Sequence, residues 1–202
     1  MRLPLLVMVC GLASLASADR LINVPTARKV LKGIARYEIS YQGAADESVM
    51  HRLAYGVDSS VDVEFRTGVL SDPRLNSTFN AGYQYLAAVP GVSPGISMGI
   101  VDALNRSDEG RKLFVALTFR EAVYTPTGES NLDITLGVFA LARSAGFVGL
   151  YLPFTREVAI LAEHDGLDIS AGFEYRPAKT IAVRWITAGN RNVYSLSFSR
   201  RL

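Results

Sequence analysis

Cysteine is almost absent from this chain: its 202 residues contain one, Cys10, inside an apolar N-terminal run. Val9 precedes it where a lipoprotein leader would carry a small residue, so we do not expect lipidation. Removing the first 18 of 202 residues leaves 184, and none of these is cysteine. Disulfide bonds and thiolate metal sites are therefore excluded from the rest of the chain.

The apolar N-terminal run itself is short. It follows one basic residue, Arg2, extends for 16 residues from Leu3, and ends with small residues at Ala16 and Ala18. A membrane anchor helix needs about 20 apolar residues, whereas a secretory signal peptide has this composition. The sequence predicts a cleaved signal peptide over 1–18 and one domain over 19–202.

A strong charge imbalance and further long apolar runs are missing too. Of 21 Lys and Arg residues only Arg2 belongs to the leader, so the mature chain carries 20 basic and 19 acidic residues, a net charge of +1. This balance does not indicate a nucleic-acid partner. The mean hydropathy is nevertheless +0.20, and no later segment reaches about 18 apolar residues. Hydrophobicity without a helical span indicates strands in lipid.

Catalytic and cofactor motifs are also lacking. The chain has two histidines, and neither has a serine two residues away on the same strand, as known outer-membrane lipases do. His164 has Glu163, Asp165 and Asp168 nearby, but their spacing is unlike a calcium-binding loop. No phosphate loop or dinucleotide fingerprint is present. We therefore expect no enzyme activity, no cofactor and no metal site.

What the chain does contain is alternation with a period of two. Between Leu161 and Pro177 two strand patterns are joined by Asp165-Gly166, a pair that favours a tight hairpin turn. In the second strand, apolar residues from Leu167 to Tyr175 alternate with polar residues from Asp168 to Arg176. Successive strand side chains point to opposite faces, so this pattern predicts a sheet with one apolar and one polar face.

The same pattern recurs along nearly the whole chain. It predicts about twelve strands near 34–42, 49–57, 61–66, 79–85, 96–102, 113–120, 132–141, 147–154, 158–164, 167–176, 181–186 and 194–199. Residues 96–102 also fit a short helix, which leaves ten strands as the alternative. Strand over more than half of a chain is unusual for a soluble domain but typical of a membrane barrel. The predicted fold is all-β, an antiparallel up-and-down transmembrane β-barrel.

The polar face distinguishes a membrane barrel from a soluble sandwich. A sandwich exposes that face to water and would carry many Lys and Glu residues, whereas here Lys is scarce and Arg is mixed with carboxylates. Such groups can form bidentate pairs in a confined lumen. We predict that the lumen is lined by Arg36, Glu38, Arg52, Asp62, Glu64, Arg66, Arg120, Asp133, Glu163, Asp168, Glu174, Arg176 and Arg184.

The apolar face is rich in aromatic residues, which suit the two membrane interfaces. They are Tyr37, Tyr41, Tyr55, Tyr83, Tyr85, Phe173, Tyr175, Trp185, Tyr194 and Phe198. An even strand number places both ends of the barrel chain on the periplasmic side. The sequence thus predicts export and insertion into the outer membrane, with outer-membrane lipid and the barrel-assembly machinery as partners.

Two stretches depart from the alternation. Residues 147–154 and 158–164 are apolar on both sides except near Glu163, which indicates that these strands face a packed interior. Residues 21–33 contain Pro25 and have no sustained period, so we expect an extended lead-in that is not a central strand.

Two segments carry a family resemblance. Residues 24–41, Val-Pro-Thr-Ala-Arg-Lys-Val-Leu-Lys-Gly-Ile-Ala-Arg-Tyr-Glu-Ile-Ser-Tyr, resemble the opening of YjbH-type outer-membrane β-barrel proteins. Leu161-Ala-Glu-His-Asp-Gly166, followed by Gly172-Phe-Glu-Tyr-Arg-Pro177, is similar to the late hairpin of that family, and Arg52 to Val63 is similar too. The resemblance implies an outer-membrane barrel that in some members is associated with exopolysaccharide production.

The leading functional hypothesis from the sequence is a non-enzymatic outer-membrane barrel with a structural or envelope-related role, for which envelope polysaccharide would be a partner. A second hypothesis is a passive channel for small polar solutes. A third is a soluble periplasmic β-barrel that carries an apolar ligand.

Overall fold

The protein is an all-β chain whose twelve strands form one closed sheet. A computed structural model describes residues 20–43, 47–69, 77–142 and 144–202; the expected signal peptide, 1–18, lies outside the described residues. The strands are β1 (Ile34–Gly43), β2 (Ser48–Gly56), β3 (Val61–Val69), β4 (Thr78–Leu86), β5 (Gly95–Val101), β6 (Lys112–Thr125), β7 (Gly128–Leu141), β8 (Ala145–Pro153), β9 (Val158–His164), β10 (Ile169–Ala178), β11 (Ile181–Ala188) and β12 (Arg191–Arg201).

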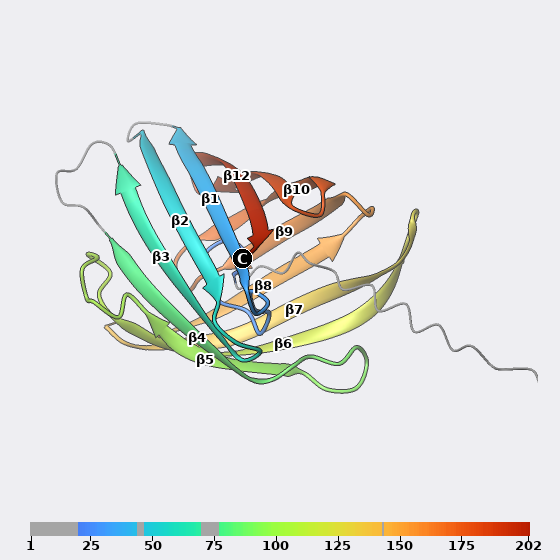
Figure 1. Ribbon diagram of the computed structural model, residues 1–202, viewed down its shortest axis with the longest axis horizontal. Coiled ribbons are helices and arrows are strands. Elements are labelled where there is room, and N and C mark those ends of the chain that lie inside the picture. Colours follow the sequence, from blue (N-terminus) through green and yellow to red (C-terminus); the bar gives the residue numbers. More distant parts are fainter. Residues whose placement is uncertain (1–19, 44–46, 70–76, 143) are drawn as a thin grey trace, which may run out of the picture.

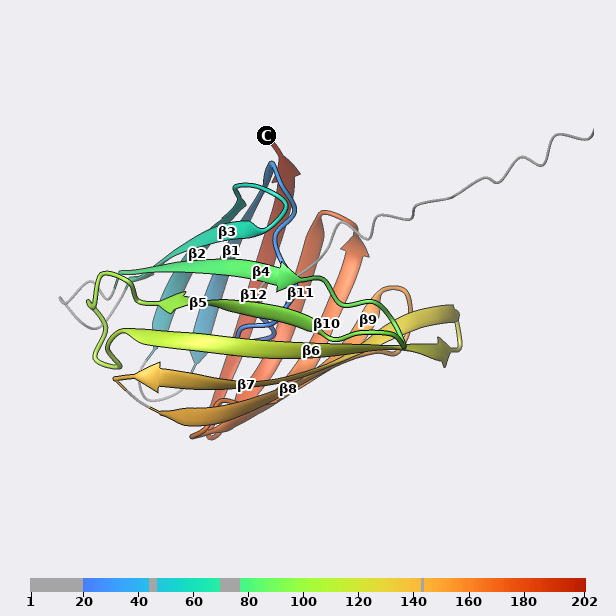
Figure 2. The same ribbon diagram turned by 90° about the horizontal axis from the view of Figure 1, so that it is seen from below.

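Each strand pairs antiparallel with its neighbours in sequence, and β1 pairs with β12, from Ile34 opposite Arg201 to Gly43 opposite Asn192. The result is the up-and-down barrel that Figures 1 and 2 show from two sides. Closure leaves no sheet edge, so the ladder pairs backbone groups within the chain, as a bilayer requires. The predicted twelve-stranded antiparallel barrel is confirmed.

The two faces of the barrel separate as the alternation predicts. In β1, Tyr37 is 39% exposed and points outward, whereas the next residue, Glu38, is 6% exposed and points inward. Large apolar side chains such as Phe65, Met98, Val138 and Trp185 are exposed on the outer surface. Most fully buried charged residues belong to the inner face. A barrel with an apolar outer surface and a polar interior has the residue distribution of a transmembrane β-barrel.

The ambiguous stretch 96–102 is a strand, so the ten-stranded and helical alternatives are wrong. β5 ends at Val101, one residue before the predicted end, because Asp102 has a positive φ of 53°. The Asp102 carboxylate accepts hydrogen bonds from the Arg106 N–H (2.9 Å) and from the Ser107 N–H and hydroxyl (both 2.7 Å). Burial raises the pKa of Asp102, but these hydrogen bonds outweigh it, so the pKa lies below its ordinary value.

The hairpin of β6 and β7 is longer than its neighbours. β5 pairs with β6 only as far as Thr118, and β8 pairs with β7 only from Asp133 onward. From there to the turn at Thr125 and Gly128, the ladder joins β6 and β7 to each other alone. Figure 2 shows this end of the hairpin projecting beyond the adjacent strands. Among the described residues, no helix is long and apolar enough to cross a membrane.

Candidate functional site

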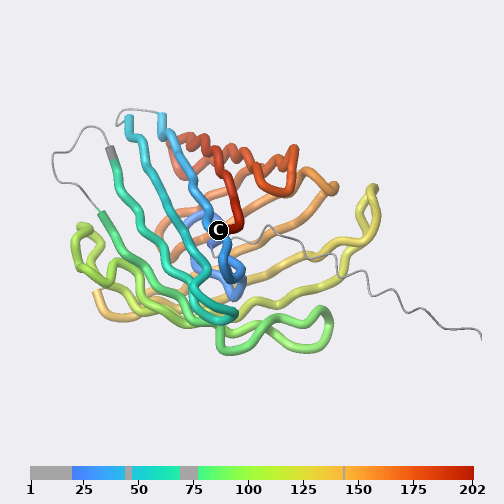
Figure 3. The backbone as a smooth tube through the Cα atoms, in the orientation of Figure 1, coloured from blue at the N-terminus to red at the C-terminus, as the bar shows by residue number. Residues whose placement is uncertain are grey.

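The lumen is occupied by the start of the described chain. Residues 20–33, which we call the plug, precede β1 and lie within the ring of strands (Figure 3). Val24 is 0% exposed and Ala27 is 2% exposed, although neither belongs to a strand. The prediction that this segment is not a central strand is confirmed. The expected extended shape is wrong, because the segment folds back on itself, with an Arg20 to Pro25 bridge, inside the barrel.

One carboxylate anchors the first part of the plug. Glu163 of β9 accepts backbone hydrogen bonds from Ile22 (3.0 Å), Asn23 (2.9 and 3.0 Å) and Val24 (3.1 Å). Consecutive backbone N–H groups that converge on one anion form a concave binding surface for it. Because Glu163 is buried, these bonds replace the water that its charge would otherwise need.

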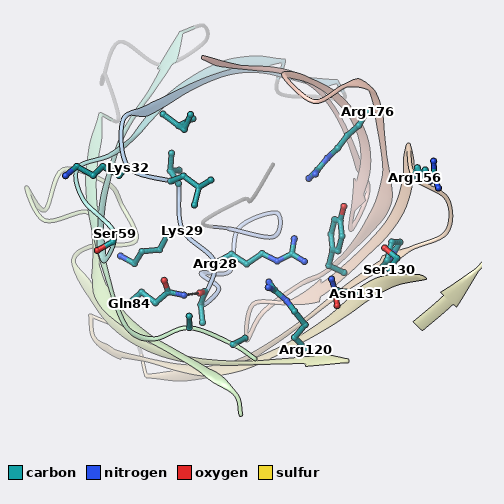
Figure 4. A pocket seen from close by; sticks show the side chains of 18 of the residues that line it. Arg28, Lys29, Lys32, Ser59, Gln84, Arg120, Ser130, Asn131, Arg156 and Arg176 are labelled. Atoms are coloured by element: carbon teal, nitrogen blue, oxygen red, sulfur yellow. Dashed lines mark hydrogen bonds between the residues drawn. The ribbon is translucent and has the colours of Figure 1, made fainter. Parts of the chain in front are cut away.

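The second part of the plug is held by polar side chains of four other strands. Thr118 Oγ1 accepts from the Ala27 N–H at 2.8 Å, and Ser97 Oγ donates to the Thr26 carbonyl at 3.0 Å. Gln84 Nε2 donates to the Ala27 carbonyl, as Figure 4 shows. The Asp62 carboxylate accepts from the Val30 N–H at 3.2 Å. The backbone groups of the plug thus find their hydrogen-bond partners among side chains of the lumen wall instead of in the sheet.

Ion pairs also join the plug to the wall of the lumen. Three cations of the plug each pair with a carboxylate of the wall: Arg20 with Glu64, Arg28 with Asp133, and Lys29 with Asp62. All six side chains are at most 13% exposed. Removing one partner from a buried pair leaves an uncompensated charge, which is strongly destabilising.

Apolar contacts complete the plug. Leu21, Ile22 and Val24 form one buried cluster with wall residues that include Phe147 and Leu161. Gly149 of β8 makes room for them, because a Cβ at this position would lie 2.8 Å from Leu21 Cδ2 and 3.2 Å from Val24 Cγ2. Phe147 and Leu161, which belong to the two stretches that are apolar on both sides in the sequence, therefore face the apolar part of the plug.

The wall of the lumen carries a further network of guanidinium and carboxylate groups. Glu174 accepts from Arg184 at 2.7 Å and pairs with Arg176 at 2.6 Å. Arg184 and Arg52 both approach Glu38, at 3.7 and 3.4 Å. Asp133 receives two hydrogen bonds from Arg120, at 2.9 and 3.1 Å.

Nearly all of the predicted lumen residues face the interior. The buried ones are Glu38, Asp62, Glu64, Asp133, Glu163, Glu174 and Arg184. Arg36, Arg52, Arg66, Arg120 and Arg176 are partly buried and contribute to interior networks or cavities. Asp168 lies in the turn before β10, where Asp165 accepts from the Leu167 and Asp168 N–H groups, and it lines the lumen cavity at that end of the barrel. It is exposed at the rim.

The histidines have structural contacts. His51 Nδ1 lies 2.6 Å from the Tyr37 hydroxyl on the outer surface, and His164 Nδ1 accepts from the Gly166 N–H at 3.0 Å. Within the described ranges, no group of three His, Cys, Asp or Glu residues is arranged to hold a metal ion.

The plug divides the lumen into two cavities. The first cavity lies at the end where β1 begins and β12 ends and has a volume of about 720 Å³ (Figure 4). We call it the basic mouth, because its lining includes Arg28, Arg120 and Arg176. The far mouth, at the end that contains Gln42 and Asp168, has a volume of about 640 Å³. Two gaps beside the plug hold about 30 and 10 Å³, space for one or two water molecules. The plug therefore lies between the two cavities.

Sequence comparisons give no relatives: no family model matches the chain, and no curated protein matches it. Family membership of the YjbH type therefore remains a prediction. Among solved structures, the chain is similar to the KdgM porin in complex with disordered oligogalacturonate, with a TM-score of 0.56 and 12% identity over 83% of this chain and 99% of that one.

It is also similar to the NanC porin, with a TM-score of 0.50 and 10% identity over 83% of this chain and all of that one. The N-terminal β-barrel domain of Pseudomonas aeruginosa OprF matches with a TM-score of 0.29 and 11% identity over 84% of this chain and 98% of that domain. The first two likenesses show that the chain has the fold of outer-membrane porins.

Proposed function

We propose that this protein is an outer-membrane channel for small polar solutes that the plug holds closed. The observation that carries the proposal is the division of one polar lumen into two cavities by a segment that is not part of the sheet. A barrel needs only its ladder for closure, whereas the plug is held by side-chain contacts that can be broken without opening the sheet.

The porin fold supports the channel hypothesis over a purely structural role. A purely structural barrel has no need of two large cavities on either side of a segment that is not part of the sheet. A carrier of apolar ligands is disfavoured because charged and polar side chains line both cavities. The channel is non-enzymatic in this proposal, and its export through a cleaved signal peptide follows from the sequence.

Liposome swelling tests the proposal. Vesicles that contain the purified protein are diluted into isotonic arabinose, and the rate of swelling reports solute entry. We compare the wild type with Glu163→Gln and Asp62→Asn, which each weaken the plug, and with Glu109→Gln, whose side chain is 74% exposed and pairs with Lys112 of β6. Gel mobility before and after boiling verifies that each variant forms a closed barrel.

We expect slow swelling for the wild type and Glu109→Gln, and faster swelling for both plug variants. Trypsin cleavage within residues 20–33 shows independently whether the plug has left the lumen. If the plug is cleaved and the vesicles still do not swell, the barrel is not a channel, and the structural hypothesis gains support.

A further inference from the structure

The basic mouth is the most asymmetric feature of the lumen. Among the described residues, its lining contains seven cations and one carboxylate: Arg28, Lys29, Lys32, Arg120, Arg156, Arg176 and Arg201 against Glu157. Figure 4 shows Lys32 and Arg156 at its edge, directed away from the lumen. Among the described residues, the far mouth has a balanced lining of four cations and three carboxylates: Arg20, Arg66, Lys112 and Arg191 against Glu109, Asp165 and Asp168. A cavity lined by one sign of charge concentrates ions of the opposite sign.

The ion pairs behind the basic mouth do not neutralise it. Asp133 is shared by Arg28 and Arg120, while Glu174 and Glu38 are shared by Arg52, Arg176 and Arg184. In the described part of the chain, this network therefore holds five guanidinium groups and three carboxylates, an excess of two positive charges. These side chains are at most 26% exposed, and repulsion between partly buried like charges is only weakly screened.

Three of these guanidinium groups converge on one part of the cavity. Arg28 comes from the plug, Arg120 from β6 and Arg176 from β10, and Figure 4 shows all three directed into the same space. Tyr151 fixes two of them, because the Arg28 and Arg176 Cζ atoms lie 4.6 and 5.8 Å from its ring centroid. Asn131 adds a neutral hydrogen-bonding group to the same cavity.

We infer that the basic mouth is a binding site for a small polar molecule that carries two or more carboxylate or phosphate groups, held by Arg28, Arg120 and Arg176. The planar guanidinium group binds such oxyanions in a bidentate manner. A cavity of about 720 Å³ lies within the usual range for small-molecule sites. The inference rests on the proposed channel function and names the class of solute for that channel. The ligand would contact both the plug and the wall of the lumen.

Isothermal titration calorimetry in detergent tests the site without requiring transport. The probes are trigalacturonate, the neutral trisaccharide maltotriose as its uncharged counterpart, and tripolyphosphate as the phosphate source. Arg120→Gln and Arg176→Gln remove one guanidinium each. Arg191→Gln makes the same change at the far mouth and is the matched control.

We expect trigalacturonate, tripolyphosphate or both to bind, and the tighter of the two identifies the source of the anionic groups. Maltotriose should not bind. Each of the two site variants should weaken binding about tenfold or more, and Arg191→Gln should leave it unchanged. Equal binding of maltotriose, absence of binding by both anions, or equal losses in Arg191→Gln would overturn the inference.

The two proposals fail in different ways. Anion binding in detergent with no solute entry in vesicles would refute the channel and leave the binding site standing. Solute entry without anion binding would refute the site and leave the channel standing.

Discussion

The Asn23 N–H donates to both oxygens of the Glu163 carboxylate, at 2.9 and 3.0 Å, across 140 positions of the sequence. Its neighbours Ile22 and Val24 donate to the same carboxylate. A single side chain of β9 therefore holds three consecutive backbone groups of the plug. Hydrogen bonds to a buried charged group are stronger than those between neutral groups, so Glu163 is the main anchor of the first part of the plug.

Replacing Glu163 by Gln should loosen the plug. Gln offers one uncharged acceptor oxygen in place of a carboxylate, so at least one buried N–H loses its partner at a cost of about 1–3 kcal/mol. Equilibrium unfolding in urea measures this loss in the free energy of unfolding. Trypsin should also cut Glu163→Gln faster at Arg28 and Lys29, with Glu109→Gln as the control. Unchanged protection of both sites would contradict the anchoring role.

The membrane-facing surface gives a prediction that depends on depth. Val115 is 45% exposed in β6, and its cross-strand neighbours Met98 and Val138 are also outward-facing aliphatic residues. We therefore place Val115 near the midplane of the bilayer, where a charged side chain is most costly. Val115→Arg should destabilise folding into lipid vesicles by about 2–4 kcal/mol. Ile169 is 68% exposed but is the first residue of β10, so Ile169→Arg should cost only about 0–1 kcal/mol. Equal losses of folding free energy in the two variants would show that Val115 is not deeper in the bilayer than Ile169.

The loop after β5 should make stability depend on pH. Because the folded-state pKa of Asp102 is lowered, its contribution is present above the unfolded pKa of about 3.9 and is lost as pH falls through the folded value. Asn tolerates the positive φ at this position but carries no charge. Wild type should therefore exceed Asp102→Asn in melting temperature at pH 7, and the difference should shrink below about pH 4. A difference that is constant with pH would contradict this.

The barrel could be predicted from the sequence because each strand carries its own evidence. Tyr37 and Glu38 already differ in polarity, and alternation of that kind separates the two faces of the sheet. The scarcity of Lys on the polar face then indicates that this face is inside. Residues 147–154 and 158–164, which are apolar on both faces, indicated that these strands face a packed interior, but not which segment packs against them.

The plug could not be predicted, because its contacts are between segments far apart in sequence. Nothing in residues 20–33 shows that Thr118, Ser97 and Gln84 satisfy its backbone, and the absence of a strand period is equally compatible with an exposed linker. The strand predicted over 167–176 begins later than expected for a local reason: Asp165 caps the turn with its side chain, so the strand starts one residue after Asp168. The asymmetry between the two mouths also emerges only once the barrel is closed.

A reversible cross-link between plug and wall tests the central claim, that the plug closes a channel. A Cβ built at Gly149 lies 3.9 Å from Leu21 Cβ, within the range of about 3.5–4.5 Å for disulfides. We would introduce Leu21→Cys and Gly149→Cys together with Glu163→Gln, which weakens the plug, and replace Cys10 by Ala. The two single-cysteine variants are the controls.

The decisive measurement is the single-channel current of the oxidised double-cysteine protein in a planar bilayer, before and after a reductant is added. The plugged channel predicts no current steps while the disulfide is intact and repeated opening steps after its reduction, with no response to reductant in the controls. Steps of equal size and frequency before and after reduction, or no steps in either state, would contradict it.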